Sequence, residues 1–221
     1  MNEQFDSASR VHPALSPAIR KTLANTFIAV SGMLAITAAA GWAMIGRPVP
    51  LLGMIALFVA GLGLIFALRA AKNSAWGLVV LAAFSAVMGA LLGPALTHHL
   101  AIPNGAQTVA TAFGLTAAVV GACAGYAITT RRDFKHLHAM LIAGLVVLLL
   151  AMVVNIFLVI PALSLTLSAV GALLFTGWLL YDLSDVINGR QTNYLQASIA
   201  VYLNIINLFS SLLNLLGLSR D

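Results

Sequence analysis

The stretch LQASIAVYLNIINLFSSLLNLLG, residues 195–217, is an apolar run in which polar side chains recur at spacings of three and four residues. Its recurring polar residues are Asn204, Asn207, Ser211 and Asn214. A helix rises about 1.5 Å per residue, so this spacing places all four on one face, in a stripe about 15 Å long. Unsatisfied amides are costly in hydrocarbon, so the stripe must face other helices or a wet cavity. We therefore expect residues 195–217 to form the central helix of a bundle, with the stripe serving either interhelical hydrogen bonds or a hydrated path.

Six further segments are apolar enough to cross a bilayer, which takes about 20 helical residues. They cover residues 23–45, 51–68, 75–96, 106–129, 138–160 and 162–181. The composition agrees, because 61% of the residues are hydrophobic and 8% are charged. Backbone groups in lipid must be satisfied within each segment, and the alternating pattern of a β-barrel is missing. The sequence predicts an all-α membrane protein, with a seven-helix transmembrane bundle at residues 23–221 and a flexible tail at residues 1–22.

The distribution of basic residues predicts the orientation of the bundle. Nine of the eleven Lys and Arg residues lie in the tail and in alternate loops: Arg10, Arg20, Lys21, Arg69, Lys72, Arg131, Arg132, Lys135 and Arg190. Only Arg47 and Arg220 lie on the other side. Because cytoplasmic loops carry the excess of Lys and Arg, we expect a cytoplasmic N-terminus and a periplasmic C-terminus in the bacterial inner membrane. The positive charge is thereby explained by topology and by contact with the lipid bilayer, which excludes nucleic-acid binding.

The sixth segment ends in two carboxylates. Asp182 and Asp185 continue a face that also carries Ser168, Gly171 and Trp178. Acidic residues at a membrane edge are candidates for function, although both could also be solvated in the headgroup layer. Gly189 follows as the natural residue to end this helix, because glycine adopts positive φ at little cost.

Small residues and histidines suggest packing rather than chemistry. Gly89 with Gly93, and Gly121 with Gly125, have the four-residue spacing that lets helices approach, within this chain or in a dimer. We expect His98 and His99 to be solvated loop residues, and no carboxylate or thiol joins them in a pattern that would bind a metal. The sequence predicts no metal centre and no cofactor.

Several motifs resemble one known family. The stretch YDLSDVINGRQTNYLQASIAVYLNIINLFSSLLNLLG, residues 181–217, is similar to the C-terminal signature of the Bax inhibitor-1 family. The motifs TTRRDF (129–134), VVNIFL (153–158), IPAL (160–163) and GRQTNY (189–194) resemble its proteobacterial branch. The resemblance implies a bundle in which six helices surround the last.

One activity implied by the family is a pH-sensitive calcium leak gated by two aspartates. The first corresponds to Asp182, whereas the place of the second reads Asn204. Two carboxylates that share a proton make a pH sensor, and calcium prefers six to eight oxygens. With one carboxylate, Asp182 is only a weak cation candidate, and tight calcium sensing is not expected. We expect Arg69 to lie at the depth of Asp182 and hypothesise that the two pair as a latch.

The other implied activity is regulation of a protease. The proteobacterial branch is associated with FtsH, the membrane-anchored AAA protease, and with its HflK/HflC-type partners. Its members restrain FtsH and can be degraded by it from the N-terminal tail. Asn204 and the branch motifs favour this function over the calcium leak. Catalysis is not expected, because no Gly-x-Ser-x-Gly, His-Glu-x-x-His or Gly-x-Gly-Asp motif is present.

Overall fold

A computed structural model describes residues 15–218, so most of the expected tail and Ser219, Arg220 and Asp221 lie outside the described residues. Seven long α-helices follow one another, and no strand occurs between residues 15 and 218. All seven are long and apolar enough to cross a membrane, which confirms the all-α prediction. The helices are α1 (Pro17–Ala43), α2 (Leu51–Ala71), α3 (Trp76–Ala101), α4 (Gly105–Thr130), α5 (His138–Leu158), α6 (Pro161–Ile187) and α7 (Tyr194–Leu218), with a short 3₁₀ turn, Lys135–Leu137, before α5.

The first helix begins six residues before the expected boundary at residue 23. The side-chain oxygen of Ser16 accepts a hydrogen bond from the N–H of Ile19 (3.3 Å), and Pro17 occupies the first helical position. Serine at the cap and proline in the first turn are typical of a helix start. Residues 17–22 of the expected tail are therefore helical, and residues 1–14 fall outside the described part.

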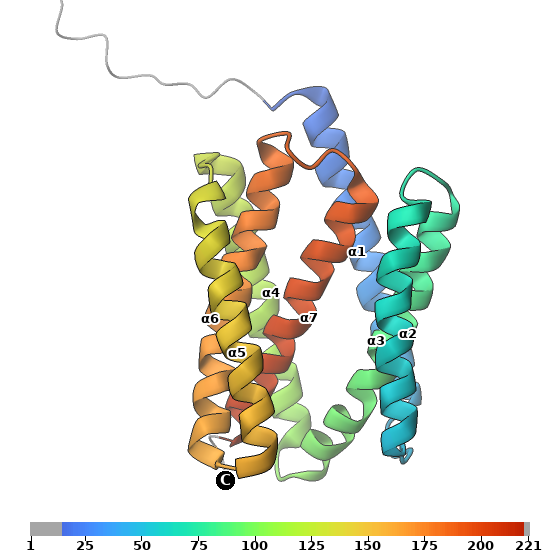
Figure 1. Cartoon of the computed structure of the whole chain (residues 1–221), viewed down its shortest axis with the longest axis vertical. Helices are drawn as coiled ribbons and strands as arrows, with labels where there is room; N and C mark the ends of the chain where they lie inside the picture. The colour runs from blue at the N-terminus through green and yellow to red at the C-terminus, as the bar shows by residue number, and fades with distance from the viewer. Residues whose placement is uncertain (1–14, 219–221) are drawn as a thin grey trace, which may run out of the picture.

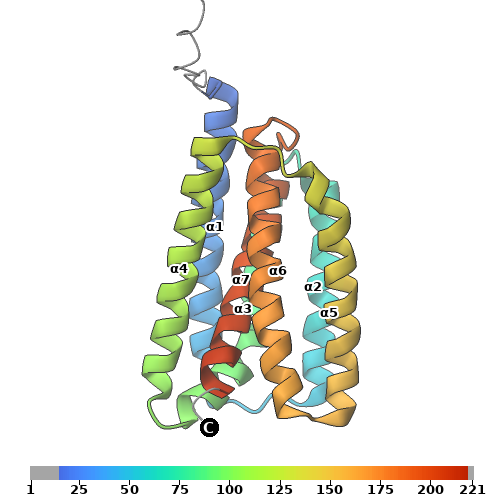
Figure 2. The same ribbon diagram turned by 90° about the vertical axis from the view of Figure 1, so that its left-hand side faces the viewer.

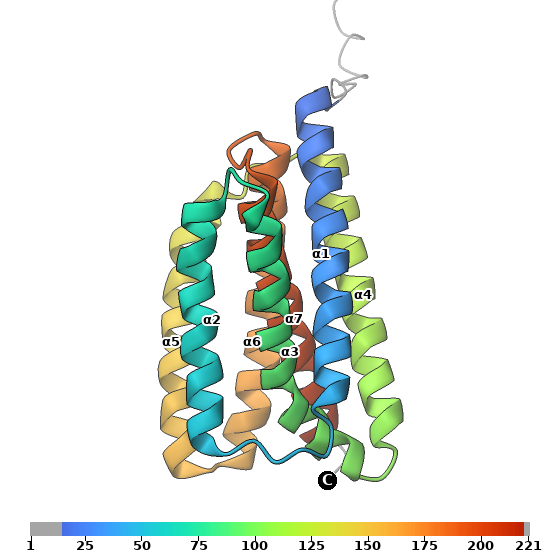
Figure 3. The same ribbon diagram turned by 90° about the vertical axis from the view of Figure 1, so that its right-hand side faces the viewer.

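The helices form two groups of three with α7 between them. In one group α3 lies between α1 and α2 (Figure 3), and in the other α6 lies between α4 and α5 (Figure 2). Helix α7 crosses between the groups (Figure 1) and packs on α1, α2, α3, α4 and α6. Helix α5 packs on α6 and does not reach α7, so five helices contact α7 rather than the expected six. It is still the most buried helix. In its most apolar 18-residue stretch 44% of the residues are buried, against at most 28% in the corresponding stretch of any other helix.

Close approach of α1 and α3 depends on one of the predicted glycine pairs. A Cβ on Gly89 would lie 2.5 Å from the carbonyl oxygen of Thr37, and one on Gly93 would meet the Cβ of Met44. Gly121 and Gly125 behave differently, since a Cβ on either would meet nothing within 4 Å. The expectation that this second pair packs within the bundle is therefore wrong, because it lies on a face of α4 that no other helix covers.

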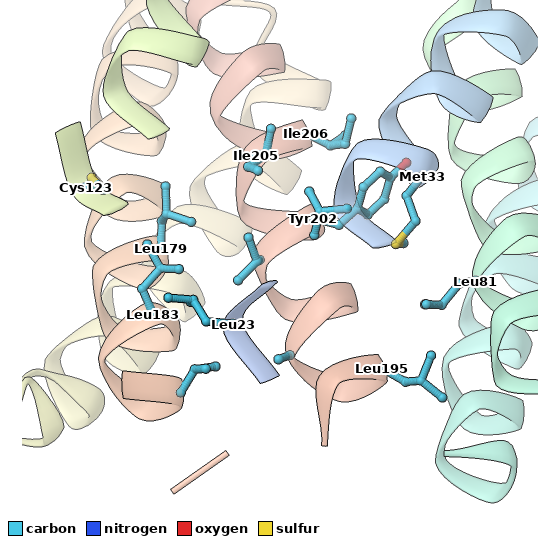
Figure 4. Packing of buried hydrophobic residues seen from close by; sticks show 14 of the residues in the cluster. Leu23, Met33, Leu81, Cys123, Leu179, Leu183, Leu195, Tyr202, Ile205 and Ile206 are labelled. Atoms are coloured by element: carbon cyan, nitrogen blue, oxygen red, sulfur yellow. The ribbon is translucent and has the colours of Figure 1, made fainter. Parts of the chain in front are cut away.

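The core joins α1, α3, α6 and α7. Figure 4 shows Leu179 and Leu183 of α6 on one side of α7 and Met33 of α1 beside Tyr202 on the other. Tyr202 is fully buried and stacks edge-on against Phe84, with ring centroids 5.9 Å apart. The Thr37 hydroxyl donates to the carbonyl of Ser85 (3.0 Å), so the Tyr202 hydroxyl, 2.5 Å away, donates to Thr37. One polar chain thus fixes three helices inside the apolar core.

The two ends of the bundle differ in charge. The N-terminal end of α1 and the loops α2–α3, α4–α5 and α6–α7 meet at the same end (Figure 1). We call this the basic end, because eight described Lys and Arg residues lie there: Arg20, Lys21, Arg69, Lys72, Arg131, Arg132, Lys135 and Arg190. At the opposite end, formed by the loops α1–α2, α3–α4 and α5–α6, the described part of the chain carries Arg47 alone among Lys and Arg.

Candidate functional site

Asp182 and Asn204 face each other across the contact between α6 and α7. The side-chain N–H of Asn204 donates to Oδ2 of Asp182 over 2.6 Å. Asn204 is buried and Asp182 is partly buried, so the pair lies inside the bundle, about five residues from the basic end of α6. When the carboxylate is ionised, the bond from the amide N–H is charge-assisted and stronger than a bond between two neutral groups.

Arg69 does not join this pair. It is exposed at the end of α2, with its guanidinium 5.8 Å from the centre of the Phe66 ring. Within residues 15–218 it makes no ion pair with Asp182, because α2 packs on α3 and α7 and does not contact α6. The hypothesis of an Arg69–Asp182 latch is therefore wrong. Two residues that are expected at the same depth of a bundle need not be in contact.

Arg190 makes the ion pairs at the basic end instead. Its Nε donates to Asp185 Oδ1 (2.8 Å), and Nη1 donates to Asp133 Oδ2 (2.6 Å) in the α4–α5 loop. Asp133 also accepts the N–H of Lys135 over 2.8 Å. That N–H lowers the pKa of the Asp133 carboxyl below its ordinary value, and Arg190 adds to the shift. Asp185 is thus an anchor for Arg190, and the guanidinium ties the α4–α5 loop to the end of α6.

The end of α6 directs Arg190 towards both acids. Gly189 has φ +72°, and its N–H donates to the carbonyl of Val186 (3.1 Å). The N–H of Arg190 reaches back to the carbonyl of Asp185 (2.9 Å). These two bonds form a Schellman motif with Gly189 at C′, which confirms the helix stop predicted from the sequence.

Ser184 and Asn193 complete the closure of this end. The buried hydroxyl of Ser184 donates to the carbonyl of Arg132 (3.0 Å) and accepts the N–H of Phe134 (3.3 Å). The amide oxygen of Asn193 caps α7, and its Nδ2 donates to the carbonyl of Lys72 (2.8 Å). Three loops are therefore joined through side chains of α6 and the α6–α7 loop. Sequence reasoning missed these roles, although TTRRDF and GRQTNY contain most of the residues.

The polar stripe of α7 is divided among different surroundings. Asn204 meets Asp182, and Asn207 is partly buried. Ser211 is buried against Gly171, where an added Cβ would lie 2.8 Å from the serine oxygen. Asn214 is exposed and lines a cavity at the opposite end. The helix therefore turns its polar face inward, as predicted, but the stripe does not line one uniform surface.

Two further observations concern possible ligands. His98 and His99 belong to the last turn of α3 rather than to a loop, and His99 is buried, which corrects the expectation that both are solvated loop residues. In the described range, residues 15–218, no three His, Cys, Asp or Glu side chains come together in a way that could hold a metal ion.

Comparison with known proteins agrees with the fold. The family model described as inhibitor of apoptosis-promoting Bax1 matches residues 19–221. A protein of Escherichia coli K12 named modulator of FtsH protease YccA is 40% identical over 202 residues, 91% of this chain and 92% of its own length. An uncharacterized membrane protein of Vibrio cholerae is 38% identical over 202 residues, 91% of each chain. An uncharacterized protein of Pseudomonas aeruginosa is 36% identical over 197 residues, 89% of each chain. With a match that covers all seven helices, this chain belongs to the Bax inhibitor-1 family.

Proposed function

We propose that this chain is a non-enzymatic inner-membrane protein that binds FtsH and restrains its proteolytic activity. The observation that carries the proposal is the similarity to the Escherichia coli protein named a modulator of FtsH protease. The similarity extends over nearly the whole of both chains, so it includes the membrane helices and the loops of the basic end.

The geometry of the basic end supports a binding function. Ser184, Arg190 and Asn193 hold three loops in one arrangement. A surface that is already ordered loses less conformational entropy when a partner binds it. By the excess of Lys and Arg this end faces the cytoplasm. Helix α1 starts at this end, so a cytoplasmic, ATP-driven protease could grip the segment that precedes it.

The lifetime of an unassembled membrane protein that FtsH degrades tests the proposal. We expect overproduction of this chain to lengthen that lifetime. A variant that lacks residues 2–14 keeps Ser16 and Pro17, and therefore α1, and should lengthen it more because it resists degradation itself. Asp182→Asn should act like the wild type, because Asn204 can hydrogen-bond to the new amide. If neither the full chain nor the truncated chain changes the lifetime, the proposal is wrong.

A calcium or other cation leak is the second candidate function. The observation that favours it is the carboxylate of Asp182 in the bundle interior, beside the polar face of α7. A leak along this route requires the basic end to open, since the closing bonds of Ser184 and Arg190 lie beyond Asp182. Calcium flux into liposomes separates the two functions: wild-type flux that Asp182→Asn abolishes supports the leak, whereas wild-type flux no higher than that of empty liposomes argues against it.

A further inference from the structure

A cavity of about 350 Å³ lies at the opposite end of the bundle, away from Asp182. It is lined by residues of α3, α5, α6 and α7, and its volume is in the lower range of small-molecule sites. Polar groups on its wall include His99, Asn155, Ser168 and Asn214, and Ile102 and Met152 add apolar surface. A wall that combines polar groups with apolar surface can orient a ligand and also bury its hydrocarbon part.

His99 presents an unused hydrogen-bond acceptor to this cavity. His99 is only 6% exposed, and its Nδ1 lies 2.8 Å from the carbonyl oxygen of Ala95. A carbonyl only accepts, so Nδ1 carries the hydrogen, and the neutral ring then has a lone pair on Nε2. In the described part of the chain, no group hydrogen-bonds to Nε2. Nε2 is therefore open to the cavity, where a ligand that carries a hydrogen-bond donor can reach it.

The neighbouring glycine makes room for this ring edge. A Cβ on Gly217 of α7 would lie 2.8 Å from both Cδ2 and Nε2 of His99. Asn155, by contrast, is already engaged, since it donates to Ser164 (2.7 Å) and accepts the N–H of Ile160 (3.2 Å). It therefore forms a fixed wall, and His98, His99 and Asn214 are the groups available to a ligand.

The electrostatics of the site favour a positively charged ligand. Three helices end at this pocket, namely α3, α5 and α7, and only α6 begins there. Each helix C-terminus carries about half a negative charge. No Asp, Glu, Lys or Arg is among the described residues that line the cavity. The acceptor on His99 and the amide oxygen of Asn214 thus add to the negative potential of the three helix ends.

We propose that this pocket binds a primary ammonium group attached to a short apolar chain, with Nε2 of His99 accepting one of the ammonium hydrogens. The apolar chain lies against Ile102 and Met152, and Asn214 accepts a second hydrogen. The site is separate from the basic end, so it does not depend on FtsH binding.

Binding of hexylamine to the purified full chain, in an uncharged maltoside detergent, tests the proposal by calorimetry. We expect saturable binding of hexylamine and little binding of hexanoate, an anion of equal chain length. His99→Phe keeps a ring but removes Nε2, and Gly217→Ala pushes the ring edge away, so both should weaken binding about tenfold or more. Gly114→Ala is the matched control, because a Cβ there meets nothing within 4 Å.

Two results of the binding experiment would contradict the proposal. If hexanoate binds as tightly as hexylamine, or if His99→Phe and Gly217→Ala bind hexylamine as the wild type does, the proposal is wrong. Should either variant fail to fold, Asn214→Leu alters an exposed side chain of the pocket and should also weaken binding.

If nanodiscs that contain phosphatidylethanolamine weaken hexylamine binding relative to phosphatidylcholine alone, the ammonium comes from a lipid headgroup; equal binding in both indicates a free amine.

Discussion

The two ends of this bundle differ in how the polar groups at the helix termini find hydrogen-bond partners. At the basic end, helix ends and loops satisfy one another through Ser184, Arg190 and Asn193. At the opposite end, three helices finish around a cavity, and a buried imidazole keeps an unused acceptor. Free backbone groups at helix ends need partners from side chains, water or ligands. The first end supplies those partners from the chain itself, and the second leaves room for a ligand.

This difference bears on both candidate functions. A regulator of FtsH can use the basic end as it stands, because an ordered surface is available for binding. A cation leak must break the bonds of that end before an ion can reach Asp182 from that side. The stability of the basic end therefore helps to decide between the two functions. It can be measured by comparing the unfolding of variants at matched positions of the two ends.

Two serines on the same helix provide the largest expected contrast. Ser184→Ala removes a buried hydroxyl that both donates to Arg132 and accepts from Phe134. It should lower the free energy of unfolding by about 1–3 kcal/mol, because the carbonyl of Arg132 and the N–H of Phe134 both lose a hydrogen-bond partner. Ser168→Ala, near the opposite end of α6, removes only a bond to the carbonyl of Ser164 and should cost about 0.5 kcal/mol or less. Unfolding in mixed detergent micelles measures both, and equal losses would contradict the contrast.

Two glycines with the same backbone angle give a smaller contrast. Gly189 and Gly46 both have φ +72°, one at each end. Gly→Ala at such an angle costs about 1–2 kcal/mol, because Cβ approaches the backbone. Gly189→Ala should cost more than Gly46→Ala, since it also disturbs the Schellman motif that positions Arg190. Thermal unfolding of the two variants side by side checks this, and a larger loss for Gly46→Ala would show that the basic end is not the more constrained one.

Removal of the Arg190 guanidinium should have a milder effect. Arg190→Met breaks the contacts with Asp133 and Asp185, and the side chain of Arg190 is 31% exposed. Solvent screening reduces the value of such pairs, so we expect a loss of about 0.5–1 kcal/mol in unfolding free energy. Arg47→Met at the opposite end is the control and should change nothing, because Arg47 is exposed and makes no ion pair within residues 15–218. Added salt should narrow the gap between Arg190→Met and the wild type.

The sequence predicts the positions of the helices better than the side-chain contacts between them. Hydropathy locates apolar segments and therefore predicts all seven helices. It does not detect the polar residues in the first or last turn of a helix. Helix α1 begins earlier because Ser16 caps it, and α6 continues through Asp182 and Asp185 to Ile187. Gly189 was predicted correctly as a helix stop because positive φ is a local property.

The site was harder to predict because its contacts are not local. Asp182 and Asn204 could be recognised from spacing and family resemblance, and the structure places them in contact. Arg69 was assigned to Asp182 from depth alone, and helix packing decided otherwise. Arg190 pairs with Asp185 and with Asp133, and Asp133 is 57 residues away along the chain. No periodicity in a single sequence predicts a pairing of that range, which the fold alone creates.

Protonation of Asp133 gives the smallest expected effect and tests the basic end without altering its shape. The folded pKa of Asp133 lies below its ordinary value of 3.8, because the N–H of Lys135 and then the guanidinium of Arg190 favour the carboxylate. A depressed folded pKa stabilises the protein above the ordinary value, and this contribution is lost as the pH falls through the folded value. The wild type should therefore melt slightly above Asp133→Asn at neutral pH, and the difference should shrink below about pH 4. In an Arg190→Met background the difference should be smaller but not absent, since Lys135 remains a donor. A difference that grows as the pH falls would have the wrong sign, and it would mean that Asp133 does not help to hold the α4–α5 loop against the end of α6.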